Sequence, residues 1–122
     1  MKTALDEAAF GPITVDITTT GRRSGTPQRI EIWVVAVGDR LVIGGTPGPR
    51  GWLANLRSDP ALILHLKGDV IADLDYVASE VTDAAVRREI WTHPTTEWYR
   101  GRSTVDDLIA NAPTVELDPR VD

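Results

Sequence analysis

Residues 18–27 read Thr18-Thr19-Thr20-Gly21-Arg22-Arg23-Ser24-Gly25-Thr26-Pro27, and this stretch joins two β-like runs at residues 13–19 and 28–37. Glycine takes positive φ angles without steric cost, and the backbone N–H groups of such a turn can point at one anion. Each arginine adds a fixed charge and a planar fork of donors that suits phosphate or carboxylate. These residues alone leave two interpretations open: a solvated basic hairpin turn, or a loop that binds an anionic ligand.

Turn residues divide the rest of the chain into short elements. We expect six strands, because six apolar or β-branched runs are bounded by Gly, Pro and Asp: residues 13–19, 28–37, 41–45, 61–66, 70–77 and 113–117. Short helices are expected at residues 52–57, at 83–91 with Thr82 as the N-cap, and at 104–111. This pattern predicts a mainly β (α+β) fold, an antiparallel barrel that pairs its own strand edges. The length of 122 residues predicts one domain spanning residues 1–122.

The long strand at residues 28–37 has two different faces. Its even positions are all apolar and predict a core face: Ile30, Ile32, Val34 and Ala36. The odd positions mix ions with an indole: Arg29, Glu31, Trp33 and Val35. This second face is typical of a pocket mouth, a subunit contact or a solvent-facing strand. Trp33 argues against full exposure, because a large aromatic side chain gains by being buried.

Charge is unevenly distributed along the chain. Thirteen Lys and Arg residues against eighteen Asp and Glu give a net charge of −5, but residues 17–68 hold seven bases and three acids, a local +4. The remaining residues therefore carry −9. Nucleic-acid binding needs a broad positive surface, so it is disfavoured. A single basic region suits a small anionic ligand better.

Several classes of protein are disfavoured by what the sequence lacks. No apolar run approaches the roughly 20 residues of a membrane span, and the start shows no targeting pattern, so we expect cytoplasmic residence. There is no cysteine, hence no disulfide and no thiolate metal ligand. The two histidines, His65 and His93, are too few and too scattered to predict a metal site.

Two ordered motifs resemble those of the deazaflavin-dependent nitroreductase / quinone reductase family. That family has a T-T-x-G-R-[KR]-[ST]-G-x-P segment, matched at residues 18–27, and a later W-Y-x-N-L-x-x-[ND]-P segment, matched by Trp-Leu-Ala-Asn-Leu-Arg-Ser-Asp-Pro at residues 52–60. The similarity extends from about residue 13 to residue 91. It implies a split β-barrel and coenzyme F-420, a deazaflavin with a phosphodiester and a glutamate tail. That anionic tail agrees with the basic region.

The resemblance also implies roles for individual residues. It assigns the phosphate and tail to the first motif, the strand end beside the deazaflavin ring to residues 44–46, and a further part of the cofactor site to the second motif. The cofactor-binding residues implied are Arg22, Arg23, Ser24, Gly25, Gly44, Gly45, Thr46, Trp52 and Asn55, with Arg50 as a substitute for a lysine of the family loop. Trp33 matches an aromatic residue on the substrate side.

The sequence departs from the family pattern at several positions. Gln28 stands where a basic residue often follows the motif proline, Glu31 stands where proline is frequent, and Leu53 stands where tyrosine is frequent. The loop at residues 46–52 is also shorter than in the best-known members of the family. These departures keep two alternatives open: a related barrel that uses flavin mononucleotide (FMN), whose phosphate also suits arginine, and a carrier that binds a ligand without turnover.

The expected reaction is hydride transfer to a small planar acceptor such as a quinone, an enone or a nitroaromatic compound. Trp33, Trp98 and Tyr99 are expected to form the apolar substrate wall, although Trp98 and Tyr99 could equally pack in the core. The proton has three candidate sources: Tyr99, Glu31 if it is buried, or water. Split barrels of this kind often pair, so a homodimer is expected.

Overall fold

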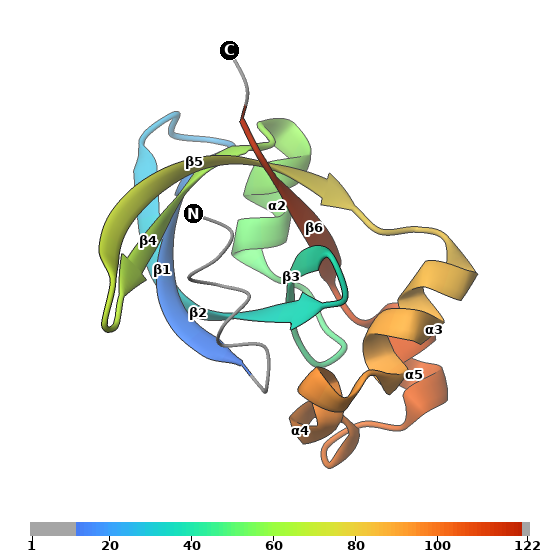
Figure 1. The fold of residues 1–122 in the computed structure, drawn as a ribbon. Helices are drawn as coiled ribbons and strands as arrows, with labels where there is room; N and C mark the ends of the chain where they lie inside the picture. The colour runs from blue at the N-terminus through green and yellow to red at the C-terminus, as the bar shows by residue number, and fades with distance from the viewer. Residues whose placement is uncertain (1–11, 121–122) are drawn as a thin grey trace.

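The computed structural model describes residues 12–120, and in it six antiparallel strands close into a barrel (Figure 1). The order around the barrel is β1-β2-β3-β6-β5-β4. The strand bounds are β1 Ile13–Thr20, β2 Pro27–Val37, β3 Arg40–Gly44, β4 Ala61–Lys67, β5 Ile71–Glu80 and β6 Thr114–Pro119. The predicted six-stranded antiparallel barrel with short peripheral helices is therefore confirmed.

The helices occupy two places relative to the barrel. Helix α2, Gly51–Ser58, packs Trp52, Leu53 and Leu56 into the core inside the barrel. The helical segments after β5 gather on one side of the barrel (Figure 1): α3 Ala84–Thr92, the 3-10 turn η1 Pro94–Thr96, α4 Glu97–Arg100 and α5 Val105–Asn111. This outer group carries the aromatic side chains discussed below.

Strand β2 contributes to two separate cores, because its side chains alternate between its two faces. Val34 and Ala36 face the barrel interior, as predicted. Val35 and Val37 lie in a second core, in which residues of α3, α4 and α5 cover the outer face of the barrel. The odd face of β2 is thus buried at its carboxyl end and open only towards its start.

The prediction that the even positions of β2 form a core face is wrong for Ile30. Ile30 is 37 % exposed, although its neighbours Val34 and Ala36 are buried. Strand β3 pairs with β2 only over residues 34–37, whereas β1 pairs with residues 27–34. Within residues 12–120, the start of β2 therefore has a ladder partner on one edge only, and Ile30 has less of the barrel around it.

The helix boundaries agree with those predicted from the sequence to within one residue, except for the N-cap of α3 and for one helical segment that was not predicted. Asp83, not Thr82, is the N-cap of α3: its carboxylate accepts a hydrogen bond from Val86 N at 3.0 Å. Thr104 caps α5 by accepting from Asp107 N at 3.1 Å. The segment η1–α4 was not predicted, because a turn of three residues and a helix of four are too short for a recognisable period.

Candidate functional site

The basic loop between β1 and β2 is a tight, hydrogen-bonded turn. Gly21 N donates to Thr26 O at 2.9 Å, and Gly25 N donates to Gly21 O at 2.8 Å. Gly25 has φ +69°, a left-handed conformation that disfavours other residues. Thr26 N donates to Ser24 Oγ at 3.2 Å. The loop geometry is thus determined by its own residues.

Asn55 ties this loop to α2. Its Oδ1 accepts from Arg22 N at 3.1 Å, and its Nδ2 donates to Thr19 Oγ1, also at 3.1 Å. Asn55 is buried, and its bond to Thr19 forms away from water, whereas the bond from Arg22 is partly buried. These bonds connect the loop to α2, and Asn55, which the resemblance assigned to the cofactor, also lines the cavity beside the loop.

A cavity of about 240 Å³ lies beside the loop; we call it the loop pocket. Arg22 and Arg23 are exposed, and within residues 12–120 neither guanidinium is in an ion pair or hydrogen bond. Their charges are therefore available to an anion. The pocket is lined by Gly21, Arg22, Arg23, Ser24, Gln28, Gly51 and Asn55.

A larger cavity of about 440 Å³ lies at the single-partnered edge of β2; we call it the aromatic pocket. It is lined by Ile30, Glu31, Ile32, Trp33, Gly44, Gly45, Thr46, Arg50, Trp52, Trp98 and Tyr99. Nine of these are predicted site residues, which the fold brings together from distant parts of the chain. Ile30 and Ile32 were assigned to the core, and no local signal in the sequence marks them as pocket residues.

Three perpendicular rings form one wall of the aromatic pocket. The ring centroids of Trp33 and Trp98 are 4.8 Å apart, those of Trp98 and Tyr99 are 5.2 Å apart, and each pair is edge-to-face. Tyr99 also packs on Trp91 of the outer core at 5.2 Å. Trp98 is 41 % exposed. Tyr99 therefore serves both expected roles, core packing and pocket wall, while Trp98 belongs to the rim.

Burial raises the pKa of Tyr99 to about 12, because the phenolate would lose its hydration. Within residues 12–120 its hydroxyl makes no hydrogen bond. At neutral pH Tyr99 thus presents an O–H group rather than an anion. It can donate a hydrogen bond to a ligand, but it is a weak acid.

The segment carrying Trp98 and Tyr99 is anchored by polar bonds. Arg100 Nη1 donates to the carbonyl oxygens of Trp91 and His93 at 3.0 and 2.9 Å. Thr95 Oγ1 donates to the carbonyl of Ala36 in β2 at 2.9 Å. Since these bonds connect η1 and α4 to both α3 and the barrel, the aromatic wall is held in place without relying on its own short helix.

The opposite wall is the strand end and loop at residues 44–50. Arg50 Nη2 donates to Thr46 O at 2.9 Å and to Thr46 Oγ1 at 3.3 Å. A Cβ on Gly45 would come within 3.0 Å of the same nitrogen. The arginine that could replace the family lysine therefore reaches the aromatic pocket, where its guanidinium is folded back on its own loop.

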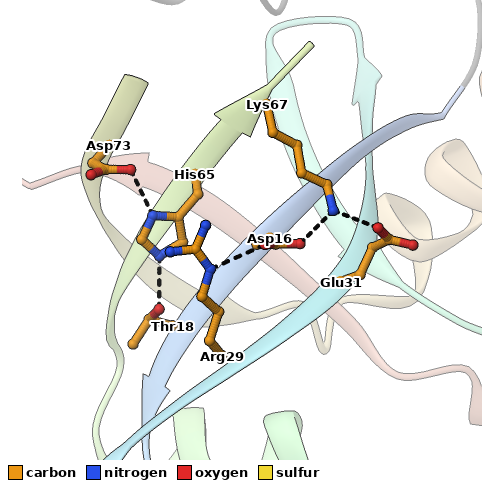
Figure 2. Close-up of polar contacts among 7 residues, drawn as sticks. All are labelled: Asp16, Thr18, Arg29, Glu31, His65, Lys67 and Asp73. Carbon is orange, nitrogen blue, oxygen red and sulfur yellow. Dashed lines mark hydrogen bonds and ion pairs between the residues drawn. The ribbon is translucent and has the colours of Figure 1, made fainter. Parts of the chain in front are cut away.

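Glu31 lies on the wall of the aromatic pocket in an ion-pair network (Figure 2). Lys67 Nζ donates to Glu31 Oε2 and to Asp16 Oδ1, and Arg29 Nε donates to Asp16 Oδ2 at 3.1 Å. The Glu31 side chain is 65 % exposed, so the burial needed for it to act as a proton donor is not present. These salt-bridge partners could not be read from the sequence, because they depend on the strand register.

The histidines lie apart from both pockets. Figure 2 shows His65 between Thr18 and Asp73: its Nε2 is 2.7 Å from Thr18 Oγ1, and its Nδ1 is 2.7 Å from Asp73 Oδ1.

Over the described part of the chain, no cluster of three His, Cys, Asp or Glu side chains could hold a metal ion. No helix there is long and apolar enough to cross a membrane.

The two pockets meet at the start of α2. Arg50 and Trp52 line the aromatic pocket, and Gly51 between them lines the loop pocket. Among residues 12–120 no side chain caps α2 at Arg50, so the first N–H groups of the helix are left to attract an anion. Consecutive residues at the start of α2 thus line both pockets.

The closed barrel is shared with solved structures of low sequence identity, and it is that of split-barrel, pyridoxamine-oxidase-like proteins. A putative pyridoxamine 5'-phosphate oxidase from Listeria innocua has a TM-score of 0.67 at 15 % identity, covering 98 % of this chain and 91 % of its own. An F420-H2 dependent reductase has a TM-score of 0.58 at 18 % sequence identity, and the match covers 86 % of this chain and 93 % of the reductase. A protein described as a domain-swapped dimer has a TM-score of 0.62 at 21 % sequence identity, and the match covers 86 % of this chain and 79 % of that protein.

The family of this chain is identified by its sequence rather than by its fold. The model of the family described as "F420H(2)-dependent quinone reductase" matches residues 7–108, and the chain belongs to this family. The expected deazaflavin reductase family is thereby confirmed.

Proposed function

We propose that this protein transfers a hydride from reduced coenzyme F-420 to a small planar acceptor, a quinone, an enone or a nitroaromatic compound. The observation that carries the proposal is the meeting of the loop pocket and the aromatic pocket at the start of α2. The family supports the use of F-420. When bound, the coenzyme supplies the hydride, and with one proton that hydride turns a quinone into a hydroquinone.

The anionic part of the coenzyme belongs, in this proposal, to the loop pocket. Arg22 and Arg23 bind the phosphate and tail, Ser24 and Gly25 shape the loop, and Asn55 holds it against α2. We place the deazaflavin ring along Gly44, Gly45 and Thr46, which line the aromatic pocket. Trp52 supports this region from the barrel core.

The acceptor lies between that ring and the aromatic wall. Trp33 and Trp98 contact its plane, and the Tyr99 hydroxyl donates a hydrogen bond to its carbonyl or nitro oxygen. Burial raises the pKa of Tyr99, so we assign it the role of hydrogen-bond donor and draw the proton from the bulk solvent and its buffer. Glu31, exposed and ion-paired, is not assigned a catalytic step.

Two measurements test this function. The first is a fluorescence titration with oxidised F-420 beside FMN, in which we expect micromolar binding of the deazaflavin alone. The second follows the return of the oxidised coenzyme's absorbance when reduced F-420 is mixed with protein and 1,4-naphthoquinone. Binding of FMN instead would support the alternative cofactor, and binding of F-420 without turnover of any acceptor would support a carrier.

We also propose a homodimer in the cytoplasm. The neighbour described as a domain-swapped dimer supports pairing, as do the exposed side chains of Ile30 and Trp98 at the aromatic pocket. Sedimentation velocity of the purified chain tests this, and a single monomer peak at high concentration would reject it.

A further inference from the structure

The aromatic pocket carries an acidic group that the proposed reaction does not use. Two of its lining residues are charged, Glu31 and Arg50, and they belong to different walls. Arg50 is bonded to the loop at residues 46–50, where we place the deazaflavin ring. Glu31 lies two residues before Trp33 on the same face of β2, the side proposed for the acceptor.

Glu31 uses one of its two carboxylate oxygens in the ion-pair network and lines the aromatic pocket. Its Oε2 accepts from Lys67, whereas within residues 12–120 no hydrogen bond is made by Oε1. A carboxylate oxygen only accepts hydrogen bonds at neutral pH. This Oε1 oxygen is an acceptor suited to a ligand's N–H group or positive charge, on the same face of β2 as Trp33, whereas the Trp98 ring already carries Arg102, whose Cζ lies 3.6 Å from the ring centroid.

The network behind Glu31 holds this carboxylate in position. Glu31 and Asp16 are directly opposite in the β1–β2 register, where two like charges would repel each other. Lys67 bonds both, and these bonds raise the pKa of Lys67, so its ammonium group persists at neutral pH (Figure 2). The bonds from Lys67 and Arg29 hold the pKa of Asp16 below its usual range. Lys67 lies behind Glu31 and does not line the pocket.

We propose that Glu31 determines specificity by charge: it favours planar acceptors that carry a cationic or N–H-bearing substituent and disfavours anionic ones. This inference rests on the proposed reductase function and adds to it the chemical class of the acceptor. The mechanism is electrostatic: an anionic substituent beside Glu31 meets a like charge at the rim, and a cationic substituent forms an ion pair there.

The expected effect is modest, because Glu31 is well exposed. For one charge at a partly solvated rim we expect a change of roughly threefold to tenfold in relative kcat/KM between oppositely charged acceptors. The effect should shrink as salt is raised, since the Debye length falls to about 3 Å at 1 M. A purely structural role of Glu31 would show no such salt dependence.

The experiment compares three quinones on four proteins. The acceptors are 1,4-naphthoquinone, its 2-sulfonate, and a naphthoquinone with a trimethylammonium group. The proteins are the wild type, Glu31→Gln, Lys67→Met, and the matched control Asp73→Asn, which removes one negative charge from the same outer face at a strand that does not line the pocket. Ratios of kcat/KM between acceptors are compared across variants, so that the intrinsic reactivity of each quinone cancels.

We expect Glu31→Gln to raise the sulfonate-to-ammonium ratio threefold to tenfold, Lys67→Met to lower it, and Asp73→Asn to leave it unchanged. In Asp73→Asn, turnover of neutral naphthoquinone and the F-420 dissociation constant should be unchanged as well. Turnover of naphthoquinone with equal ratios in all four proteins would overturn the charge selection and leave the reductase standing. If Asp73→Asn shifted the sulfonate-to-ammonium ratio as much as Glu31→Gln does, the effect would come from the net charge of the protein, and charge selection by Glu31 would be overturned too. Absence of turnover with all three acceptors would reject the reductase itself, and the inference with it.

Discussion

The loop pocket and the aromatic pocket lie on either side of the start of α2, but they are built differently. Most of the loop pocket comes from one short segment, residues 21–28, and only Gly51 and Asn55 come from elsewhere. The aromatic pocket combines β2, the end of β3 with its loop, α2 and α4. The pocket proposed for the anionic tail is therefore encoded locally, whereas the pocket proposed for the acceptor depends on how distant segments pack.

The largest expected effect is on the loop pocket. Replacing both Arg22 and Arg23 by alanine should weaken F-420 binding by about 3 kcal/mol or more, roughly a hundredfold, because each charge-assisted hydrogen bond contributes about 1.5–3 kcal/mol. The free energy of unfolding should change little, since both side chains are exposed. The measurement is a fluorescence titration with F-420, together with denaturant unfolding.

Arg88→Ala is the control for that double variant, because Arg88 is exposed on α3 and lines neither pocket. It should leave the dissociation constant unchanged. If the double variant bound F-420 as tightly as the wild type, the loop pocket would not be the anchor and the two pockets would lose their proposed division of roles.

The next effect is on the packing behind the aromatic pocket. A Cβ on Gly44 would lie 2.8 Å from the Trp91 ring and 2.8 Å from Pro113 O, both in buried positions. Gly44→Ala should therefore lower the free energy of unfolding by about 1–3 kcal/mol, as overpacking does. Gly68→Ala is the control, since a Cβ there meets no atom within 4 Å. Equal denaturant midpoints for the two variants would mean that Trp91 can move aside without cost.

The same contrast explains what could be predicted from the sequence. The strands and the basic loop follow from alternation and turn residues, which are local. Residues 21–24 of the first motif line one pocket, whereas Gly25, also predicted to bind the cofactor, does not line it. The exposure of Ile30 could not be predicted, because it depends on β3 being too short to cover the start of β2. The salt bridges of Glu31 depend on the register of β1, β2 and β4.

The helical side of the aromatic pocket was predicted least well for a related reason. Thr82 and Asp83 are adjacent residues that can both cap a helix, so sequence alone could not choose between them. The position of α4 is determined by Arg100 and Thr95, whose partners are backbone carbonyls of other elements. Such bonds leave no trace in a local pattern, although Trp98 and Tyr99 were singled out by their chemistry.

A third prediction separates acceptor binding from cofactor binding. Trp33→Ala should lower kcat/KM for naphthoquinone about tenfold, close to 1.4 kcal/mol, because an aromatic contact on the acceptor is lost. The F-420 dissociation constant should change less than threefold. The two quantities are measured on the same preparation by turnover and by titration. The opposite ranking would move Trp33 to the cofactor side and reduce the difference between the two pockets.

The smallest expected effect concerns the network that supports Glu31, and it appears only in acid. Hydrogen bonds from Lys67 and Arg29 hold the pKa of Asp16 below its ordinary 3.8, so the folded state binds the Asp16 proton less readily than the unfolded state. The stabilisation by Asp16 is therefore complete above that pKa and is lost as pH falls below it. Asp16→Asn should show a shallower loss of denaturant midpoint than the wild type between about pH 5 and pH 3. Parallel curves would show that Asp16 contributes no pH-dependent stability, and Glu31 would then be positioned by Lys67 alone.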